Sequence, residues 1–338
     1  MKSRKRERRI IVALAAVLAA VFIVSFSIGR YPVSVKELAG IVLSRFVDIE
    51  QFWTDSMVKV LYNIRLPRVL LACMVGCCLS VAGAVFQGVF RNPMASPQVL
   101  GASKGASFGA CLAILLGLSS MQITLSAFVF GMLSILIVMF FGRRVKGNAA
   151  MGLILAGIMV GSLFEAGVSF MKITADPTNE LPAMTYWLVG SLSGATMKDV
   201  AFIAVPMAIG LIPLFLLRWR LNMLTMDEDE ARTLGVNTRR LRLAALCCAT
   251  LITASCVAVS GLISWVGLVM PHVARKLTGS DYRYMISTSA LTGAVFLLIV
   301  DNISRSLLRT EIPIGILTAF VGAPFFLYLL SGRGERRR

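Results

Sequence analysis

Residues 65–78 read RLPRVLLACMVGCC: two arginines flank a proline, and a membrane-length apolar run starts directly after them. A proline in the first turn of a helix costs nothing there, because its missing N–H would be unsatisfied anyway. The i, i+3 spacing then places the guanidinium groups of Arg65 and Arg68 on one face of the helix. This stretch contains no acidic residue that could neutralise them.

The composition around this stretch is that of a polytopic all-α membrane protein. Of 338 residues, 57% are hydrophobic and only 15% are charged, and the mean hydropathy is +0.80; soluble domains carry roughly 25% charged residues. The net charge of +17 would suggest nucleic-acid binding in a soluble protein. Here the positive charge lies in short loops between apolar segments, so we attribute it to membrane topology and expect no nucleic-acid partner.

Charged and Pro/Gly-rich breaks divide the chain into about ten segments of membrane length. The N-terminal apolar run is longer than that of a usual signal peptide and no A-x-A site follows it, so we interpret it as a retained first helix. We expect one transmembrane domain over residues 1–338, with spans at 10–28, 69–90, 97–117, 120–142, 149–171, 196–217, 241–260, 262–277, 285–305 and 312–330.

The distribution of Lys and Arg predicts the orientation of these spans. An even number of crossings puts both termini on one side, and that side receives 23 Lys and Arg residues against ten on the other. The positive-inside rule then makes the basic tails 1–9 and 332–338 cytoplasmic. Arg65, Arg68 and Arg305 fall on the outer face, which the rule disfavours. They are either anchors that snorkel to the headgroups or a docking site for an acidic partner.

Little in the sequence supports enzyme chemistry. The seven cysteines all lie in apolar runs and resemble packing residues, not disulfide or metal partners. The chain has one histidine, no HExxH, no Cys-x-x-Cys and no Walker A motif, so we expect no cofactor, metal or ATP bound by this chain itself. His272, which follows a proline, is interpreted mainly as a structural hydrogen-bonding residue.

Two segments could carry a mechanism. Residues 87–110 hold two prolines and four glycines, which predicts either a broken connection lining an aqueous path at the inner surface or an ordinary turn with close glycine packing. Residues 222–242 form the longest cytoplasmic loop. Thr225 and Glu228 have the spacing of a capping box and Gly235 can end the helix that follows. This short acidic helix is either a contact for a partner subunit or a solvated surface helix.

Two further charged features lie within or beside spans. Glu165 sits inside an apolar segment, where a carboxylate is a functional candidate by default; a hydrogen-bonded glutamate facing a neighbouring helix is the alternative. Asp301 and Arg305 are spaced i, i+4 near the outer surface, so part of the charge of Arg305 is expected to be paired locally.

Taken together in this order, several motifs resemble the permease subunit of the iron-siderophore, haem and vitamin B12 class of ABC importers, the FecCD-type permeases. The resemblance covers roughly residues 60–330. The matching stretches are RLPR (65–68), Gln87 with RNPMASP and LGASKGA (91–106), Trp187 with Gly190 and Ser191, LGV (234–236), VSGLISWVGLVMPHVARKLTGSDYR (259–283), Asp301 with Arg305, and EIPIGILTAFVGAPFFLYLL (311–330).

The resemblance implies a type II importer fold of ten helices per subunit in a bacterial or archaeal plasma membrane. It also implies a homodimer with the path along its interface, two cytoplasmic ATPase subunits that carry ATP and Mg, and an external binding protein. The implied site residues are the docking arginines Arg65, Arg68 and Arg305; the ATPase-coupling residues Asp227, Glu228, Ala231, Arg232, Leu234 and Gly235 in the loop 222–240; and the path and inner-gate residues Gln87, Asn92, Pro93 and Met94.

The chain departs from the family pattern at Met94, where leucine is usual, and at Tyr282, where histidine is usual; Glu165 matches no pattern. A ferric siderophore is the preferred cargo, because the family is richest in it, with haem, a corrinoid or an oxyanion as alternatives. The main rival function is a proton-coupled secondary transporter that uses Glu165. An intramembrane enzyme is a distant third, since no nucleophile–base or metal constellation is convincing.

Overall fold

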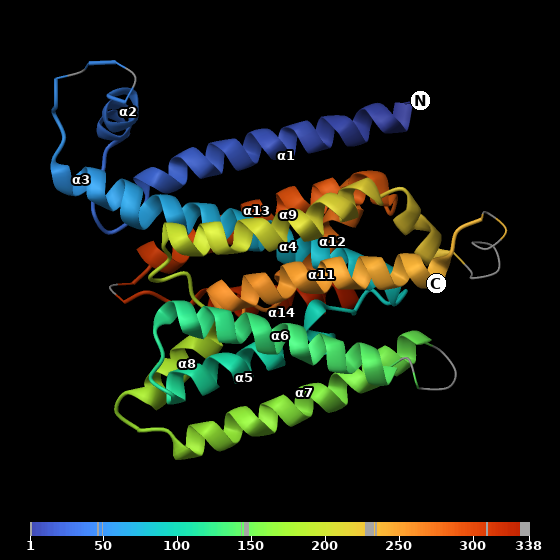
Figure 1. The fold of residues 1–338 in the computed structure, drawn as a ribbon. Helices are drawn as coiled ribbons and strands as arrows, with labels where there is room; N and C mark the ends of the chain where they lie inside the picture. Colours follow the sequence, from blue (N-terminus) through green and yellow to red (C-terminus); the bar gives the residue numbers. More distant parts are fainter. Residues whose placement is uncertain are drawn as a thin grey trace.

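The computed structural model describes residues 2–45, 47–48, 50–142, 144, 149–226, 233, 235–308 and 310–331. Throughout these ranges the regular structure is helical, without a strand. The helices run roughly side by side in a flattened bundle (Figure 1). The first half contains α1 (Lys2–Ser27), α2 (Val35–Leu43), α3 (Asp55–Lys59), the π-helical turn η1 (Val60–Arg65), α4 (Leu66–Val89), the 3₁₀ turn η2 (Pro97–Leu100), α5 (Ala102–Leu115) and α6 (Ser120–Gly142).

The second half contains α7 (Ala149–Thr174), α8 (Glu180–Val189), α9 (Met197–Leu216), η3 (Arg220–Thr225), α11 (Thr238–Ser260), α12 (Val266–Thr278), α13 (Tyr282–Ser306) and α14 (Ile314–Ser331). Each of the ten expected spans coincides with one of these helices. Seven helices in the described part of the chain are long and apolar enough to cross a membrane. The helices α5, α12 and α14 are shorter.

The structure differs from the sequence-based expectation in two ways. The expected span 97–117 is not continuous, because Gly101 takes a left-handed conformation (φ +74°) between η2 and α5. The basic residues 2–9 are helical, since α1 already begins at Lys2. The short helices α2 and α8 lie between the spans and were not foreseen, and neither was α3, which continues through η1 into α4 as one helical stretch, Asp55–Val89.

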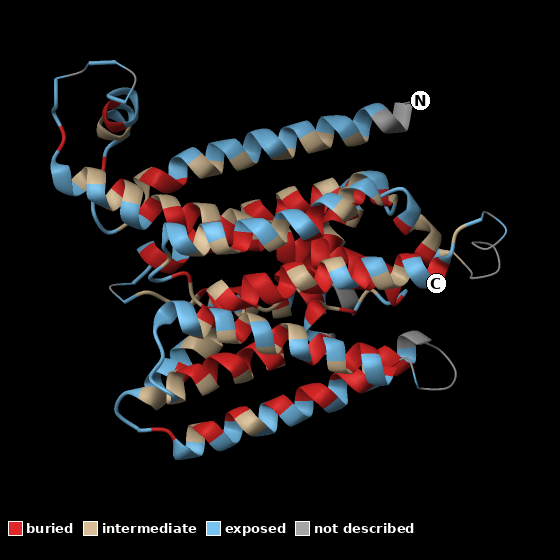
Figure 2. Ribbon diagram, in the orientation of Figure 1, coloured by how far each residue is buried: buried red, intermediate tan, exposed pale blue. Residues whose placement is uncertain are grey.

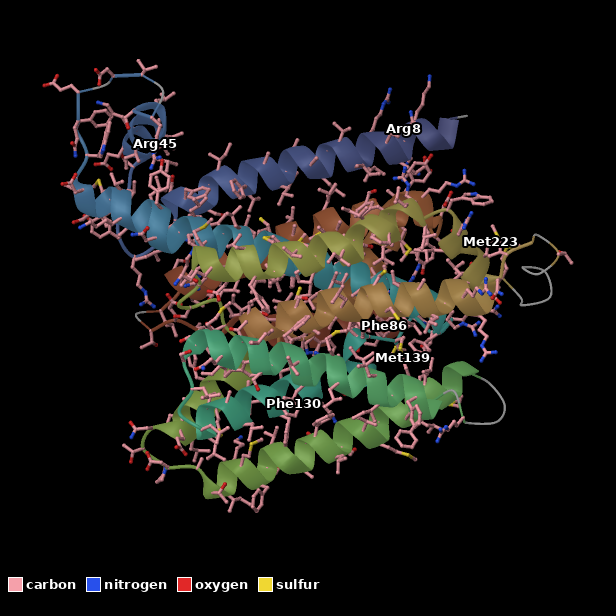
Figure 3. All side chains as sticks on the ribbon, in the orientation of Figure 1. Arg8, Arg45, Phe86, Phe130, Met139 and Met223 are labelled. Atoms are coloured by element: carbon pink, nitrogen blue, oxygen red, sulfur yellow. The ribbon has the colours of Figure 1, made fainter. Side chains whose placement is uncertain are left out.

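The middle of the bundle is built around α4, which is buried along most of its length (Figure 2). Phe86 lies in this centre and is fully buried (Figure 3). Two crossings bring backbones into direct contact. A Cβ on Gly76 would lie 2.3 Å from the carbonyl oxygen of Gly293 on α13, and a Cβ on Gly83 only 1.7 Å from that of Gly267 on α12. Such small-residue crossings provide the van der Waals packing that holds helices together in lipid.

The start of α1 and the end of α14 lie at the same end of the bundle. Arg8 of α1 lines a cavity together with Trp219 from the connection after α9 and Arg283 from the first turn of α13. At the same end, Lys276 in the last turn of α12 lies 5.9 Å from the ring of Tyr328 on α14. Following the orientation predicted from the charge distribution, we refer to this as the inner end and to the opposite end, which carries α2 and α3, as the outer end (Figure 1).

At the outer end, α2 starts with a complete capping box. The backbone N–H of Glu37 donates to Ser34 Oγ, and the backbone N–H of Ser34 donates to Glu37 Oε2 at 2.7 Å. These bonds favour the carboxylate and hold the pKa of Glu37 below its usual value. The box therefore supports α2 at neutral pH and weakens when acid protonates Glu37.

Candidate functional site: an arginine cluster and two interrupted helices

Arg68 is neutralised by two carboxylates from distant parts of the sequence. Its Nε lies 2.7 Å from Asp301 Oδ1 on α13, and its Nη1 lies 2.8 Å from Glu311 Oε2 just before α14. The Asp301 side chain is fully buried, whereas that of Glu311 is partly exposed. The positive charge of Arg68 is thus neutralised within the chain. The two carboxylates lie far from residues 65–78 in the sequence, so that stretch alone could not have predicted them.

Arg305 belongs to the same cluster. Its Nε lies 3.6 Å from Asp301 Oδ2, which confirms the expected i, i+4 ion pair. Its Nη2 donates to the carbonyl oxygen of Ser25 at 2.6 Å and to the side chain of Asn302. Because Asn302 also donates to Ser25 Oγ at 2.8 Å, these bonds fasten the outer end of α1 to α13.

Arg65 completes the cluster. Its Nη1 donates to the carbonyl oxygen of Phe26, and its Nη2 donates to that of Tyr31. The exposed fractions of Arg65, Arg68 and Arg305 are only 3%, 5% and 5%. The cluster therefore joins α1, α4 and α13 at the outer end, the side on which the charge distribution predicted these arginines. Their role in docking stays a prediction, and docking through these side chains would exchange intrachain partners for those of the binding protein.

At the inner end, two expected path residues are bonded to α12. Gln87 Nε2 donates to the carbonyl oxygen of Leu268 at 3.2 Å, and Gln87 Oε1 accepts from Arg275 Nη2 at 3.1 Å. The carbonyl oxygen of Pro93 lies 3.0 Å from His272 Nε2. The structural interpretation of His272 is therefore favoured, and the connection after α4 is held against α12.

The other two expected gate residues lie at the surface of the same connection. Asn92 Oδ1 accepts from the backbone N–H of Met94 at 2.9 Å, and Met94 is 46% exposed. Arg91, which sequence reasoning did not single out, has φ +48° and donates from Nε to the carbonyl oxygen of Leu224 at 3.1 Å. The connection is thus tied to η3, directly before the expected coupling segment.

The coupling residues Asp227, Glu228, Ala231, Arg232 and Leu234 lie outside the described residues. Gly235 is described and has φ +73°, the left-handed conformation common directly after a helix. The role assigned to this segment stays a prediction.

Two interrupted helices meet deep in the bundle around a cavity of about 250 Å³. One break precedes α5 at Gly101, and the other precedes α12, where Trp265 takes φ +72°. Gln98 Nε2 donates across the breaks to Ser264 Oγ at 3.0 Å. Irregular backbone at membrane depth is tolerated only where protein packs around it or where it lines a water-filled space. Here protein packs around both breaks, which line this cavity between α5 and α12. The sequence indicated only the first break.

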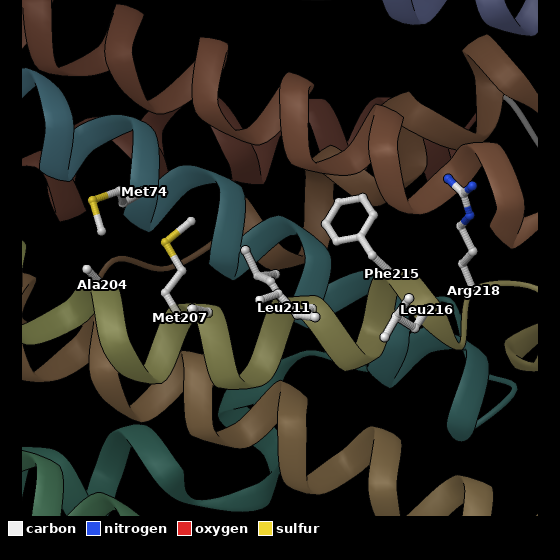
Figure 4. Close-up of a pocket in the computed structure, with 9 residues that line it drawn as sticks. Met74, Ala204, Met207, Leu211, Phe215, Leu216 and Arg218 are labelled. Carbon is white, nitrogen blue, oxygen red and sulfur yellow. The ribbon is translucent and has the colours of Figure 1, made fainter.

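A larger cavity of about 700 Å³ lies between α4 and α9 (Figure 4). Apart from Arg218 at its inner end, the side chains that line it are apolar, among them Met74, Met207, Leu211 and Phe215. It opens outward along the length of α9. Such a lining suits lipid tails and offers no group that could orient a polar cargo.

Glu165 has a partner that the sequence analysis did not identify. Its Oε2 lies 2.6 Å from Lys104 Nζ, and the two side chains are 64% and 42% exposed. The sequence signal for this pair was a lysine within one apolar segment and an acid of opposite charge within another.

The whole chain is similar to transport permeases. Residues 17–332 match the FecCD transport family. The chain is 37% identical over 318 residues to the molybdate import system permease protein MolB of Haemophilus influenzae (94% of each chain), and 38% identical over 322 residues to a probable iron chelatin transport system permease protein of Helicobacter pylori (94% of this chain, 96% of the relative).

A solved structure described as an inward-facing conformation of a metal-chelate type ABC transporter has the same fold. It superposes with a TM-score of 0.86 at 35% identity, covering 96% of this chain and 99% of the other. The chain therefore belongs to the FecCD transport family of ABC importer permeases.

Proposed function

We propose that this chain is the membrane permease of an ATP-driven importer that carries a metal chelate, with a ferric siderophore as the preferred cargo. The observation that carries the proposal is the fold match over 96% of the chain to a metal-chelate type transporter. Two copies would form the path, two ATPase subunits would bind ATP and Mg at the inner end, and a binding protein would dock at the outer end. In the plasma membrane both termini would be cytoplasmic, and the permease itself would catalyse no reaction.

The geometry suggests how movement could pass through the chain. A push on the segment after η3 would reach the connection after α4 through the contact between Arg91 and Leu224. That connection is bonded to α12 by Pro93 and Gln87. Displacement at the inner end would therefore be transmitted to the cavity between the interrupted helices.

The coupling segment can be tested without a known cargo. We expect the chain to co-purify with an ATPase subunit in mild detergent, and replacement of residues 227–235 by a Gly/Ser linker to abolish this association. The matched control replaces residues 44–50, at the outer end, by the same kind of linker and should retain the ATPase. An association that survives the first replacement contradicts the coupling role.

Docking at the arginine cluster predicts a distinct effect of Arg65→Gln. Because Arg65 donates only to backbone carbonyls, this substitution removes a charge without leaving a carboxylate unpaired. We expect at least about tenfold weaker association with the binding protein, the loss typical of a charge-assisted contact of about 1.5 kcal/mol or more. Surface capture of the binding protein measures it, with Arg283→Gln at the inner end as the control; equal affinities in both variants contradict docking.

The cargo is best identified by uptake into proteoliposomes that contain the permease, its ATPase and its binding protein. Relatives carry names that refer to iron chelatin, Fe(3+)-citrate, hemin, cobalamin and molybdate. ATP-dependent uptake of a ferric chelate, in preference to hemin, cobalamin and molybdate, supports the siderophore proposal. Preferential uptake of molybdate would make the cargo an oxyanion.

The secondary-transporter alternative is weakened by the partner of Glu165. Glu165 is not an isolated carboxylate within the membrane, because its Oε2 lies 2.6 Å from the ammonium group of Lys104. Family membership also supports an ATP-driven mechanism.

A further inference from the structure

The helix α7 presents two exposed stripes of opposite character. One stripe is apolar and includes Met159, Leu163 and Phe170, which are 70%, 73% and 67% exposed. The other is polar, with its members at the helical spacing of three and four residues that places side chains on one face. They are Ser162, Glu165 and Ser169, which are exposed, and Lys172, which is half-buried.

Lys104 extends this polar stripe from the neighbouring helix. It lies in the first turn of α5 and passes over Gly161 of α7, where a Cβ would come within 2.9 Å of Lys104 Cδ. The absence of a side chain at Gly161 thus lets the lysine stem lie against α7. Its ammonium group reaches Glu165 Oε2 at 2.6 Å.

The pair lies at the depth of the hydrocarbon core. Glu165 is the seventeenth residue of α7, so it lies about 24 Å from the start of the helix and about 14 Å from its end. Both side chains are nevertheless substantially exposed in the isolated chain. Charged groups at this depth face the interior of an assembly or a water-filled cavity and not lipid. The polar stripe must therefore be covered by something that is missing from a single chain.

The position of α7 indicates what covers it. It is an edge helix, packed on α5, α6 and η2, and its remaining surface is open (Figure 2). We propose that Ser162, Glu165 and Ser169 with Lys104 form one wall of a water-filled path that a second copy of this chain closes, and that the Lys104–Glu165 pair is a contact for a hydrophilic, charged cargo. This inference rests on the proposed function and names residues of its path.

The chemistry of the wall suits the passage of a charged cargo better than its tight binding. The ion pair carries no net charge, and the hydroxyls of Ser162 and Ser169 already donate to carbonyl oxygens within α7. A charged chelate can exchange weak polar contacts with such a wall, but it meets no unpaired charge that would hold it. An apolar cargo would gain nothing from this face.

Thiol labelling tests the wall in the full permease–ATPase complex in proteoliposomes. We expect Ser162→Cys and Ser169→Cys to react with a membrane-impermeant methanethiosulfonate reagent at least ten times faster than the matched variants Leu163→Cys and Phe170→Cys. Each control lies one residue further along α7 on the apolar stripe, and the wild-type chain measures the background from its own cysteines. Equal rates at serine and control positions, or no labelling at any of them, overturn the proposal.

The charge pair is tested by comparing an anionic with a cationic reagent at Ser169→Cys. Adding Glu165→Gln leaves Lys104 without its counter-ion and should raise the anionic-to-cationic rate ratio about tenfold, because one charge at about 6 Å in water changes each of the two rates about threefold, in opposite directions. Adding Lys104→Gln should lower the ratio by a similar factor. If neither substitution changes the anionic-to-cationic rate ratio, the Lys104–Glu165 pair does not line the path. Labelling needs neither ATP nor cargo. Failure of this inference, seen in the labelling rates, is therefore distinguishable from failure of the proposed function, seen as absence of the ATPase.

Discussion

We expect Asp301→Ala to be among the most destabilising substitutions in this chain. Asp301 is fully buried and lies against two arginines, with Arg68 Nε at 2.7 Å and Arg305 Nε at 3.6 Å. Without this carboxylate, two guanidinium groups remain inside the protein with too little negative charge around them. Removing one partner of a buried ion pair typically costs about 3–5 kcal/mol, because the remaining charge cannot regain its hydration.

The expected result is a midpoint of thermal unfolding in detergent lower by roughly 10 °C. Arg283→Ala is the control, because its pair with Asp281 is 3.8 Å long and half exposed, and an exposed pair contributes at most about 1 kcal/mol. A second variant, Asp301→Asn, keeps the shape and one acceptor and should fall between the two. If Asp301→Ala unfolds at the wild-type temperature, Glu311 alone neutralises the cluster and the three-helix junction is not held by charge.

The spans were predictable because runs of apolar residues in the sequence indicate them directly. Each of the ten expected segments coincides with a helix, since a run of about 20 apolar residues has few alternatives in a membrane. The interruptions were harder to foresee. The break at Gly101 lies in the stretch 87–110, for which a broken connection was one of two predictions. The left-handed Trp265 at the start of α12 was not foreseen; it packs against Gly322, where a Cβ would come within 2.4 Å of the tryptophan Cβ. Tertiary packing, not local sequence, fixes that turn.

The partners of charged residues were the least predictable part of the site. The pair of Asp301 and Arg305 could be foreseen because it is local, but Glu311 lies 243 positions from Arg68 and Lys104 lies 61 positions from Glu165. A single sequence contains no signal for such distances. The sequence did show the anomaly itself, which is charged residues where membrane segments disfavour them. At Arg68 and at Glu165 the structure pairs that charge with an opposite one.

Tyr282 illustrates how a departure from the family pattern is accommodated. Its hydroxyl donates to the carbonyl oxygen of Ala84 at 2.8 Å, and its backbone N–H donates to Asn222 Oδ1. The ring lies against Gly88, where a Cβ would come within 2.2 Å of the hydroxyl oxygen. A large buried residue thus fits at the start of α13 because α4 has no side chain opposite it.

The second large effect is expected for Gly83→Ala. The added Cβ would lie 1.7 Å from the carbonyl oxygen of Gly267, and because that atom belongs to backbone, no side-chain rotation can relieve the overlap. The helices α4 and α12 would have to separate, at a cost above the roughly 1–3 kcal/mol of ordinary overpacking. Gly131→Ala is the matched control, since its Cβ would meet its neighbours at 3.4 Å, an ordinary contact.

The effect of Gly83→Ala should also reach the gap between the interrupted helices. Gly267 lies close to Pro97 of η2, with 3.2 Å between a Cβ built on Gly267 and Pro97 Cδ, so displacing α12 moves both sides of the cavity. We expect a lower unfolding midpoint together with faster labelling of Ser264→Cys by an impermeant thiol reagent. A variant with wild-type stability and unchanged labelling would mean that the α4–α12 crossing can widen without cost, and that the close contact of the two glycines does not hold the gap in shape.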